Sequence, residues 1–331
     1  MRTLRYQDRV VEVEPGGVLS IGNFDGVHVG HQEILKAAQQ LALDRHRALT
    51  LMTFEPHPAV ILHPEKAPKV LTPLDWKLHL LGRFAHACVV LQDDRDLLRL
   101  DAGQFVDRFL VQTIRPSVIV EGEDFKFGAD RRGSVETLRA LGTKMGWDVT
   151  VVPSRQIVLP SGQTLRVSST MIRSMLEAGD VADAALALGR PFRLLGRVIR
   201  GRGKGRQIGF PTLNLQRPDQ ILPAEGVYAG WVLTARTQEV LLSREERLPA
   251  VFSLGRARTF GEDNPQLIEA HVLSGPPGDT AISWMAMDFA EHLRPQHTFS
   301  SVDDLVAQIR KDCQRAKTLL DRGRGGDRSP D

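Results

Sequence analysis

Two hydrophobic periods alternate along residues 18–152, and this alternation constrains the fold more than any other feature of the chain. Short runs of apolar and β-branched residues are separated by longer segments in which apolar residues recur every three or four positions. The short runs predict buried strands, and the longer segments predict amphipathic helices. Strands that alternate with helices are typical of an α/β domain with a mostly parallel sheet. The predicted strands are 18–21, 48–54, 87–91, 118–121 and 148–152, and the predicted crossover helices are 32–43, 73–84 and 102–113.

The pattern changes in the second half of the chain. Two short helices are predicted at 168–176 and 181–188, with Ser168 or Ser169 as the N-cap of the first. From residue 194 onward, short strand-like runs are interrupted by Gly, Pro and Asn, which favours a small antiparallel β-barrel. These runs are 194–199, 227–233, 250–253, 267–273 and 282–289. A terminal helix is predicted at 301–320, because acidic residues open it and basic residues close it, as the helix dipole favours.

Size and composition fit two soluble domains. The chain has 331 residues, of which 42% are hydrophobic, so each of two domains can have its own core. We predict domains at 1–187 and 188–322, followed by a disordered tail at 323–331. The formal net charge of +3 is too small to indicate nucleic-acid binding.

Several classes of protein are disfavoured by simple patterns. Cys88 and Cys313 stand in no metal-ligand spacing, and they are too few for a disulfide framework. The first residues lack the apolar core of a signal peptide, and no stretch reaches the roughly 18 apolar residues of a membrane span. We therefore expect a cytoplasmic protein that binds neither nucleic acid nor membrane.

A glycine-rich loop follows the first predicted strand. It reads Gly-Asn-Phe-Asp-Gly-Val-His-Val-Gly-His over residues 22–31, so His28 and His31 are three positions apart. Loops at the carboxyl edge of an open α/β sheet are where such sheets bind ligands. Glycines let backbone N–H groups approach phosphate oxygens, a helix N-terminus favours negative charge, and both histidines can donate to a reacting phosphorus centre. A nucleotide site without the Lys-Ser/Thr of a P-loop is predicted; two ordinary surface histidines are the alternative.

This loop resembles the nucleotidyltransferase signature of bacterial bifunctional riboflavin kinase/FMN adenylyltransferases, also called FAD synthetases. A second segment, Ser-Ser-Thr-Met-Ile-Arg at 168–173, resembles the element with which that family holds the triphosphate of ATP. A helix N-terminus with one arginine suits a polyphosphate, although the same residues also make an ordinary helix cap. The resemblance implies a Rossmann-like nucleotidyltransferase domain in which His28, His31 and Arg173 are catalytic. The ATP-binding residues that it implies are Gly22, Asn23, Phe24, Asp25, Gly30, Arg166, Ser168, Ser169 and Thr170.

Two further segments match the same family and again follow predicted strands. They are Thr-Phe-Glu-Pro-His-Pro at 53–58 and Glu-Gly-Glu-Asp-Phe-Lys-Phe-Gly at 121–128. The resemblance implies that Glu55, His57 and Asp124 bind the flavin or the phosphate of FMN. Ordinary loop carboxylates remain the alternative for Glu55 and Asp124.

The second half resembles the riboflavin kinase core of the family. Its sequence Pro-Thr-Leu-Asn matches the Pro-Thr-x-Asn element that supplies ligands to Mg-ATP. Thr212 and Asn214 are two residues apart in an extended segment, so their side chains share one face, and their oxygens suit Mg²⁺. Lys204 and Arg206 in the preceding basic loop are implied phosphate contacts, and Glu269 is the implied catalytic base. A basic hairpin turn and a solvated strand face are the alternatives without the resemblance.

The resemblance spans nearly the whole chain and implies a riboflavin kinase-like barrel with a terminal helix. The implied reactions are riboflavin to FMN on the barrel and FMN to FAD on the α/β domain, with ATP as co-substrate and Mg²⁺ as cofactor. The chain departs from the family where Ser253 and Arg258 replace Asn and Pro, and where 274–278 replace an Asp-Phe pair. Three alternatives stay open: a monofunctional FMN adenylyltransferase whose barrel only binds flavin, a nucleotidyltransferase for another nucleotide, and a flavin-sensing regulator.

Overall fold

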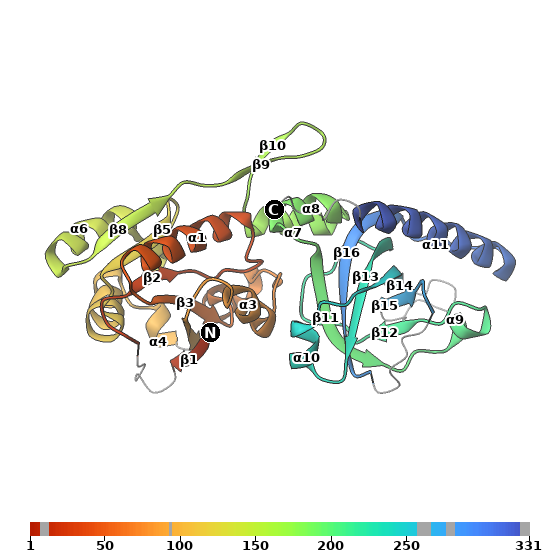
Figure 1. Ribbon diagram of the computed structural model, residues 1–331, viewed down its shortest axis with the longest axis horizontal. Coiled ribbons are helices and arrows are strands. Elements are labelled where there is room, and N and C mark those ends of the chain that lie inside the picture. Colours follow the sequence, from red (N-terminus) through yellow and green to blue (C-terminus); the bar gives the residue numbers. More distant parts are fainter. Residues whose placement is uncertain (7–12, 93–94, 257–265, 276–281, 325–331) are drawn as a thin grey trace. The chain divides into compact units, whose positions relative to one another are not determined.

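The computed structural model describes the chain except for residues 7–12, 93–94, 257–265, 276–281 and 325–331. It divides into two compact units, Met1–Ser169 and Thr170–Asp331 (Figure 1). The boundary predicted at 187/188 stays a prediction. Three predicted features lie wholly or partly outside the described residues: Arg258, residues 276–278 and the tail from residue 325 onward. Residues 323 and 324, which were predicted to begin the tail, belong to the last helix. Within the described ranges, no helix combines the length and the apolar character that a bilayer crossing requires.

The first unit is built on a six-stranded sheet in the order β1-β4-β3-β2-β5-β8, and all of its strand pairs are parallel. Its strands are β1 (Arg2–Tyr6), β2 (Val18–Ile21), β3 (Leu49–Glu55), β4 (Ala87–Gln92), β5 (Val118–Gly122) and β8 (Asp148–Val152). Every residue of β2 is buried, as expected for a central strand that helices cover on both faces. The predicted parallel sheet is confirmed.

Helices join the parallel strands and bury the faces of the sheet. They are α1 (Val29–Asp44), α2 (Pro58–Leu62), η1 (Pro64–Lys66), α3 (Leu74–Leu81), α4 (Arg95–Leu98), α5 (Ala102–Phe105), η2 (Val106–Ile114), η3 (Ala129–Arg131) and α6 (Val135–Met145). α1 packs on β2 and β5, and its buried residues include Leu35 and Ala38. A core cluster that includes Ile21, Phe109 and Leu138 joins the sheet to η2 and α6. The helix predicted at 102–113 is present, but it continues as the π-helix η2 after the short α-helix α5.

Two short antiparallel pairs complete the first unit. β6 (Lys126–Phe127) pairs with β7 (Gly133–Ser134), and β9 (Gln156–Val158) pairs with β10 (Thr164–Arg166). In Figure 1 the β9–β10 hairpin extends away from the sheet. Neither pair was predicted, because strands of two or three residues are too short to show a hydrophobic period.

The second unit is a closed barrel of six antiparallel strands in the order β11-β12-β15-β14-β13-β16. The strands are β11 (Phe192–Ile199), β12 (Leu213–Leu215), β13 (Gly226–Ala235), β14 (Leu248–Arg256), β15 (Gln266–Val272) and β16 (Trp284–Arg294). Closure pairs each of these strands with a neighbour on both sides. The predicted small antiparallel barrel is confirmed, although β14 and β16 are longer than the runs predicted at 250–253 and 282–289.

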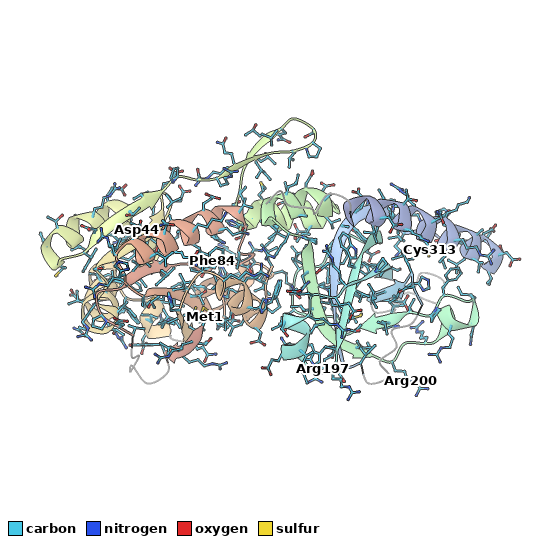
Figure 2. The ribbon with its side chains drawn as sticks, in the orientation of Figure 1. Met1, Asp44, Phe84, Arg197, Arg200 and Cys313 are labelled. Atoms are coloured by element: carbon cyan, nitrogen blue, oxygen red, sulfur yellow. The ribbon has the colours of Figure 1, made fainter. Side chains whose placement is uncertain are left out.

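The helices described from Ser169 onward are α7 (Ser169–Ala178), α8 (Val181–Leu188), α9 (Lys204–Gln207), α10 (Gln238–Ser243) and the terminal helix α11 (Val302–Arg324). α11 packs on β13 and β14 through a core cluster that includes Trp231 and Leu320. The guanidinium of Arg294 donates to the Asp312 carboxylate from Nη2 at 2.8 Å, which ties α11 to the end of β16. Cys313 on α11 (Figure 2) is a free thiol whose pKa burial raises to about 11.

Candidate active sites

The glycine-rich loop lies at the position where an open α/β sheet binds its ligands. The chain leaves β2 toward β3 on one side, and β5 pairs with β2 on the other side. The strand order therefore reverses at β2, and the carboxyl ends of β2 and β5 flank the switch point. Gly22 begins the loop there and donates its N–H to the Met52 carbonyl at 3.0 Å.

The loop has a tightly turned backbone that the segment before α3 holds in place. Phe24, Val27 and Gly26 all have positive φ, at 48°, 40° and 87°, and the first two are strained positions for residues with a side chain. The Asp25 carboxylate accepts the backbone N–H groups of Leu71 and Thr72 at 2.9 and 3.0 Å. The Gly26 N–H in turn donates to the Thr72 hydroxyl at 2.9 Å. Asp25 thus shapes the loop, and its predicted contact with ATP stays a prediction.

His28 and His31 stack on each other at the start of α1. Their ring centroids are 3.6 Å apart with an interplanar angle of 16°. The Phe24 ring is nearly perpendicular to that of His31, with 5.4 Å between the ring centroids. His28 is the N-cap of α1, because its Nδ1 accepts the His31 N–H at 3.2 Å. A neutral His28 ring that accepts at Nδ1 carries its proton on Nε2, so Nε2 can donate to a ligand. An added Cβ at Gly30 would lie 3.2 Å from His28 Nδ1, which explains why glycine suits that position.

The predicted flavin segment lies beside the same loop. The Asn23 amide Nδ2 lies 3.1 Å from His57 Nε2, and the Asn23 carbonyl accepts the Thr53 hydroxyl at 3.2 Å. His57 caps α2, since its Nδ1 accepts the Ala59 N–H at 3.1 Å. The structure therefore brings two predicted sites together, the ATP loop after β2 and the flavin segment after β3. Glu55, which ends β3, lies 3.6 Å from the ammonium of Lys77 on α3.

A buried carboxyl group adjoins the switch point. Glu121 is 3% exposed, and its Oε1 accepts the Ile21 N–H at 2.6 Å. Burial raises the pKa of Glu121 well above its ordinary value, and the hydrogen bond from Ile21 opposes this only in part. The side chain thus ties the end of β5 to the residue that precedes the glycine-rich loop. From the sequence, Glu121 was placed in the 121–128 segment without a role of its own, and Lys77 was not singled out.

The predicted triphosphate segment begins α7. Ser168 stands at the N-cap position, and the hydroxyl of Ser169 donates to the Asp25 carbonyl at 2.8 Å. This bond holds Ser169, the last residue of the first unit, against the glycine-rich loop. Thr170 and Arg173 belong to the second unit, and their place at the triphosphate stays a prediction.

Arg166 and Asp124 form an ion pair in the first unit. Arg166 ends β10, Asp124 follows β5, and both side chains are at least half exposed. The pair joins the predicted ATP contact to the predicted flavin contact across a solvated surface. Its net contribution to stability is small, because exposed ion pairs are screened by water.

Thr212, which directly precedes β12, and Asn214 on β12 come together with Glu269 on the neighbouring strand β15. The Thr212 hydroxyl donates to Glu269 Oε1 at 3.2 Å, and Asn214 is directly opposite Glu269 in the β12–β15 register. Burial raises the pKa of Glu269 above its ordinary value, while hydrogen bonds from Thr212 and Asn214 and the charge of Arg202 lower it in part. A half-buried carboxyl beside a hydroxyl and an amide is suited to accept a proton from a bound alcohol.

The basic loop precedes this group of three residues. Arg200 follows the end of β11 (Figure 2), and Lys204 and Arg206 are exposed on the short helix α9. Gly201 packs against the Asn214 amide, since an added Cβ would lie 2.7 Å from its Cγ. The loop is thus anchored at Asn214, and its cations are accessible to an anionic ligand.

Ser253 lies in β14, at a position where the sequence was predicted to depart from the family. It is opposite Glu269 in the β14–β15 register, and its hydroxyl accepts Gln296 Nε2 at 3.0 Å. Gln296 also donates to the Leu254 carbonyl at 3.1 Å. The serine hydroxyl therefore has a partner in Gln296.

The barrel residues fit a hard cation. The donors are a hydroxyl oxygen, an amide oxygen and a carboxylate oxygen, and Mg²⁺ prefers oxygen ligands completed by water and substrate phosphates. Groups of three or more His, Cys, Asp and Glu side chains that would form an all-protein metal cage do not occur in the part of the chain that the structure describes. Thr212 and Asn214 are thus suited to hold Mg²⁺ only together with a nucleotide.

Comparisons with known proteins agree with this arrangement. Family models match the chain as FAD synthetase over residues 11–171 and as riboflavin kinase over residues 188–320. The bifunctional riboflavin kinase/FMN adenylyltransferase of Escherichia coli K12 is 36% identical over 309 residues, which cover 90% of this chain and 91% of the relative. The protein of the same name from Haemophilus influenzae is 33% identical and covers 97% of this chain and 98% of its own.

A solved structure shares the fold of the whole chain. It is a Streptococcus pneumoniae protein described as a macrolide-efflux protein, with a TM-score of 0.81 and 26% identity over 96% of this chain and 99% of that chain. Both halves of the sequence thus match successive domains of one family, in the same order and along nearly the full length of the curated relatives. The chain belongs to the bifunctional riboflavin kinase/FMN adenylyltransferase family.

Proposed function

We propose that the barrel phosphorylates riboflavin to FMN and that the α/β unit adenylylates FMN to FAD, each with ATP. The contact between Thr212 and Glu269 carries the bifunctional reading, because it joins the predicted metal ligand to the predicted base. A barrel that only binds flavin has no need of a half-buried carboxyl group in that position. The free thiols of Cys88 and Cys313 and the use of ATP support a cytoplasmic location.

In adenylyl transfer, a phosphate oxygen of FMN attacks the α-phosphorus of ATP. The new P–O bond joins FMN to AMP as FAD, and the bond to the β-phosphate breaks and releases pyrophosphate. The nucleophile is already an anion near neutral pH, so positioning and charge stabilisation suffice without a general base. His28 donates from Nε2, since its Nδ1 is held by the helix N–H. The backbone N–H groups of the loop supply further donors to the triphosphate.

In the kinase reaction, the 5′-hydroxyl of riboflavin attacks the γ-phosphorus of ATP, and ADP leaves. A neutral hydroxyl must lose its proton, and the Glu269 carboxylate accepts it. Its hydrogen bond from Thr212 fixes the direction of the carboxylate. Lys204 and Arg206 are suited to contact the phosphates from the basic loop.

Magnesium supplies charge neutralisation to the phosphates when it is bound with ATP. Thr212 and Asn214 would hold it in the barrel, as their oxygen donors allow. In the first unit we predict no residue as a metal ligand, and the nucleotide phosphates would hold the ion there.

Chromatography of the products tests the proposal. The purified protein is incubated with ATP and Mg²⁺ and either riboflavin or FMN. FAD from both substrates supports the two activities. FAD from FMN alone favours the rival, an FMN adenylyltransferase with a non-catalytic barrel, and no FAD from either substrate contradicts the flavin assignment.

A further inference from the structure

Lys77 is a buried lysine on the core face of α3. The side chain is 6% exposed, and the other buried residues of the helix are Trp76, Leu80 and Leu81. Lys77, Leu80 and Leu81 are spaced as i, i+3 and i+4, so they share one face of the helix. An apolar residue is expected on such a face, because a buried ammonium loses its hydration. Packing alone therefore does not explain why a lysine occupies this buried position.

Both direct partners of Lys77 belong to the end of β3. Its Nζ donates to the Phe54 carbonyl at 3.1 Å and lies 3.6 Å from a carboxylate oxygen of Glu55. Burial lowers the pKa of Lys77, and the negative charges of Glu55 and Asp25 offset part of that effect. The ammonium is thus coupled to the carboxylate of the predicted flavin segment and to the carboxylate of the glycine-rich loop.

The segment that leads into α3 holds the glycine-rich loop itself. Leu71 and Thr72 donate their N–H groups to Asp25, and Lys77 follows five residues after Thr72. Residues 71–77 therefore contact the loop after β2 and the carboxyl end of the neighbouring strand β3. The segment fixes the loop relative to the end of that strand.

The charges at this edge of the sheet pose a problem for the proposed substrates. ATP and FMN are polyanions, yet Asp25 and Glu55 place two carboxyl groups at the edge where they would bind. Repulsion between like charges grows as water is excluded, because the local dielectric constant falls. A cation placed against Glu55 offsets that repulsion and holds the carboxylate in one direction.

We propose that Lys77 is a positioning residue for adenylyl transfer, which fixes and neutralises Glu55 so that FMN can bind beside the glycine-rich loop. This inference rests on the proposed adenylyltransferase activity. It adds a residue that touches neither reacting group and acts through Glu55.

The test compares Lys77→Met with the wild type in FAD formation from FMN and ATP. Methionine keeps the length and the apolar stem of lysine, so α3 should still pack. We expect the KM for FMN to rise about tenfold with a smaller change in kcat, since an unpaired Glu55 repels substrate more than it alters the chemical step. Lys77→Arg, which keeps the charge, should retain most of the FMN affinity. Phosphorylation of riboflavin by the same protein should be unchanged.

Lys36→Met is the matched control, because Lys36 is an exposed lysine on α1 whose partner is Glu33. It should leave the KM for FMN unchanged. The double variant Glu55→Gln/Lys77→Met should have the same KM for FMN as Glu55→Gln alone, because Lys77 acts only through the carboxylate. Where Lys77→Met alone does not fold, the double variant, which leaves no unpaired Glu55 carboxylate, is compared with Glu55→Gln in its place.

Several outcomes would overturn the inference. One is a folded Lys77→Met protein whose KM for FMN is unchanged. A second is a Lys77→Met protein in which kcat and thermal stability fall together while the KM for FMN stays the same. A third is a double variant whose KM for FMN is higher than that of Glu55→Gln alone. Failure of the proposed function is distinguishable, because the wild type itself would then form no FAD.

Discussion

At the scale of single residues, His28 combines a structural and a chemical role on two atoms of one ring. Nδ1 caps α1, and the same ring presents Nε2 to the predicted phosphate site. The two roles can be separated, because asparagine is a good N-cap but does not reach as far as the imidazole.

We expect His28→Asn to keep most of the stability and to reduce FAD formation by about 10²- to 10³-fold, as for other lost transition-state donors. His28→Ala should lose the same activity and about 1 kcal/mol of stability as well, because the cap is also removed. Thermal unfolding and FAD formation from FMN measure the two effects. Equal stability of the two variants would show that the cap is unimportant, and FMN formation from riboflavin is the control.

Glu269 gives the kinase reaction its own pH dependence. Burial raises the pKa of this carboxyl above its ordinary value of 4.5, and only the ionised form can accept the riboflavin proton. The kinase rate should therefore fall as the pH drops through the raised pKa. The rate of FAD formation from FMN should show no such fall with pH. Glu269→Gln should lower the kinase rate about 10²- to 10⁴-fold and remove its fall at low pH. If the fall at low pH persists in the glutamine variant, another group is responsible for it.

The sequence predicts residues that stand in a recognisable motif. It does not predict residues whose role depends on being buried against distant parts of the chain. His28, Thr212 and Glu269 stand in recognisable motifs, and the structure places the last two in contact. Lys77 lies in a helix that was predicted, but a lysine in an amphipathic pattern is normally assigned to the solvent face. Thr72 could not have been found either, because its partner Asp25 is 47 residues away and no local pattern connects them.

At the scale of elements, the predictions succeeded where the hydrophobic pattern is strong. Strand β2 and helix α8 have the predicted bounds, since the first is apolar on both faces and the second is largely alanine and leucine. β1 was missed because most of its residues are exposed and two are arginines, as befits an edge strand. α6 was also missed, although its signals were present: Ser134 forms a capping box and Gly146 ends the helix with φ of 91°.

The turn between β11 and β12 offers a prediction at this scale. Gly201 follows β11 and lies against the buried amide of Asn214 on β12. Gly201→Ala should push that amide away, so more Mg²⁺ should be needed for half-maximal kinase activity, by about tenfold or more for a lost oxygen ligand. FAD formation from FMN by the same protein is the control. An unchanged magnesium requirement would argue against Asn214 as a ligand.

At the scale of the whole molecule, the chain carries two units with separate cores and, as we propose, separate active sites. FMN is the product of one reaction and the substrate of the other, and both reactions consume ATP. A chain of this kind gains nothing from a shared site, because a hydroxyl nucleophile needs a base and a phosphate nucleophile does not.

Independence of the two sites predicts complementation between two inactive proteins. His28→Asn should convert riboflavin to FMN and stop there, and Glu269→Gln should convert FMN to FAD but not use riboflavin. A mixture of the two should therefore form FAD from riboflavin, after a lag in which free FMN accumulates in solution. Chromatography of time points measures both species. If each variant has its single activity but the mixture forms no FAD, FMN must pass between the units of one molecule without release, and loss of both activities in either variant would contradict separate sites.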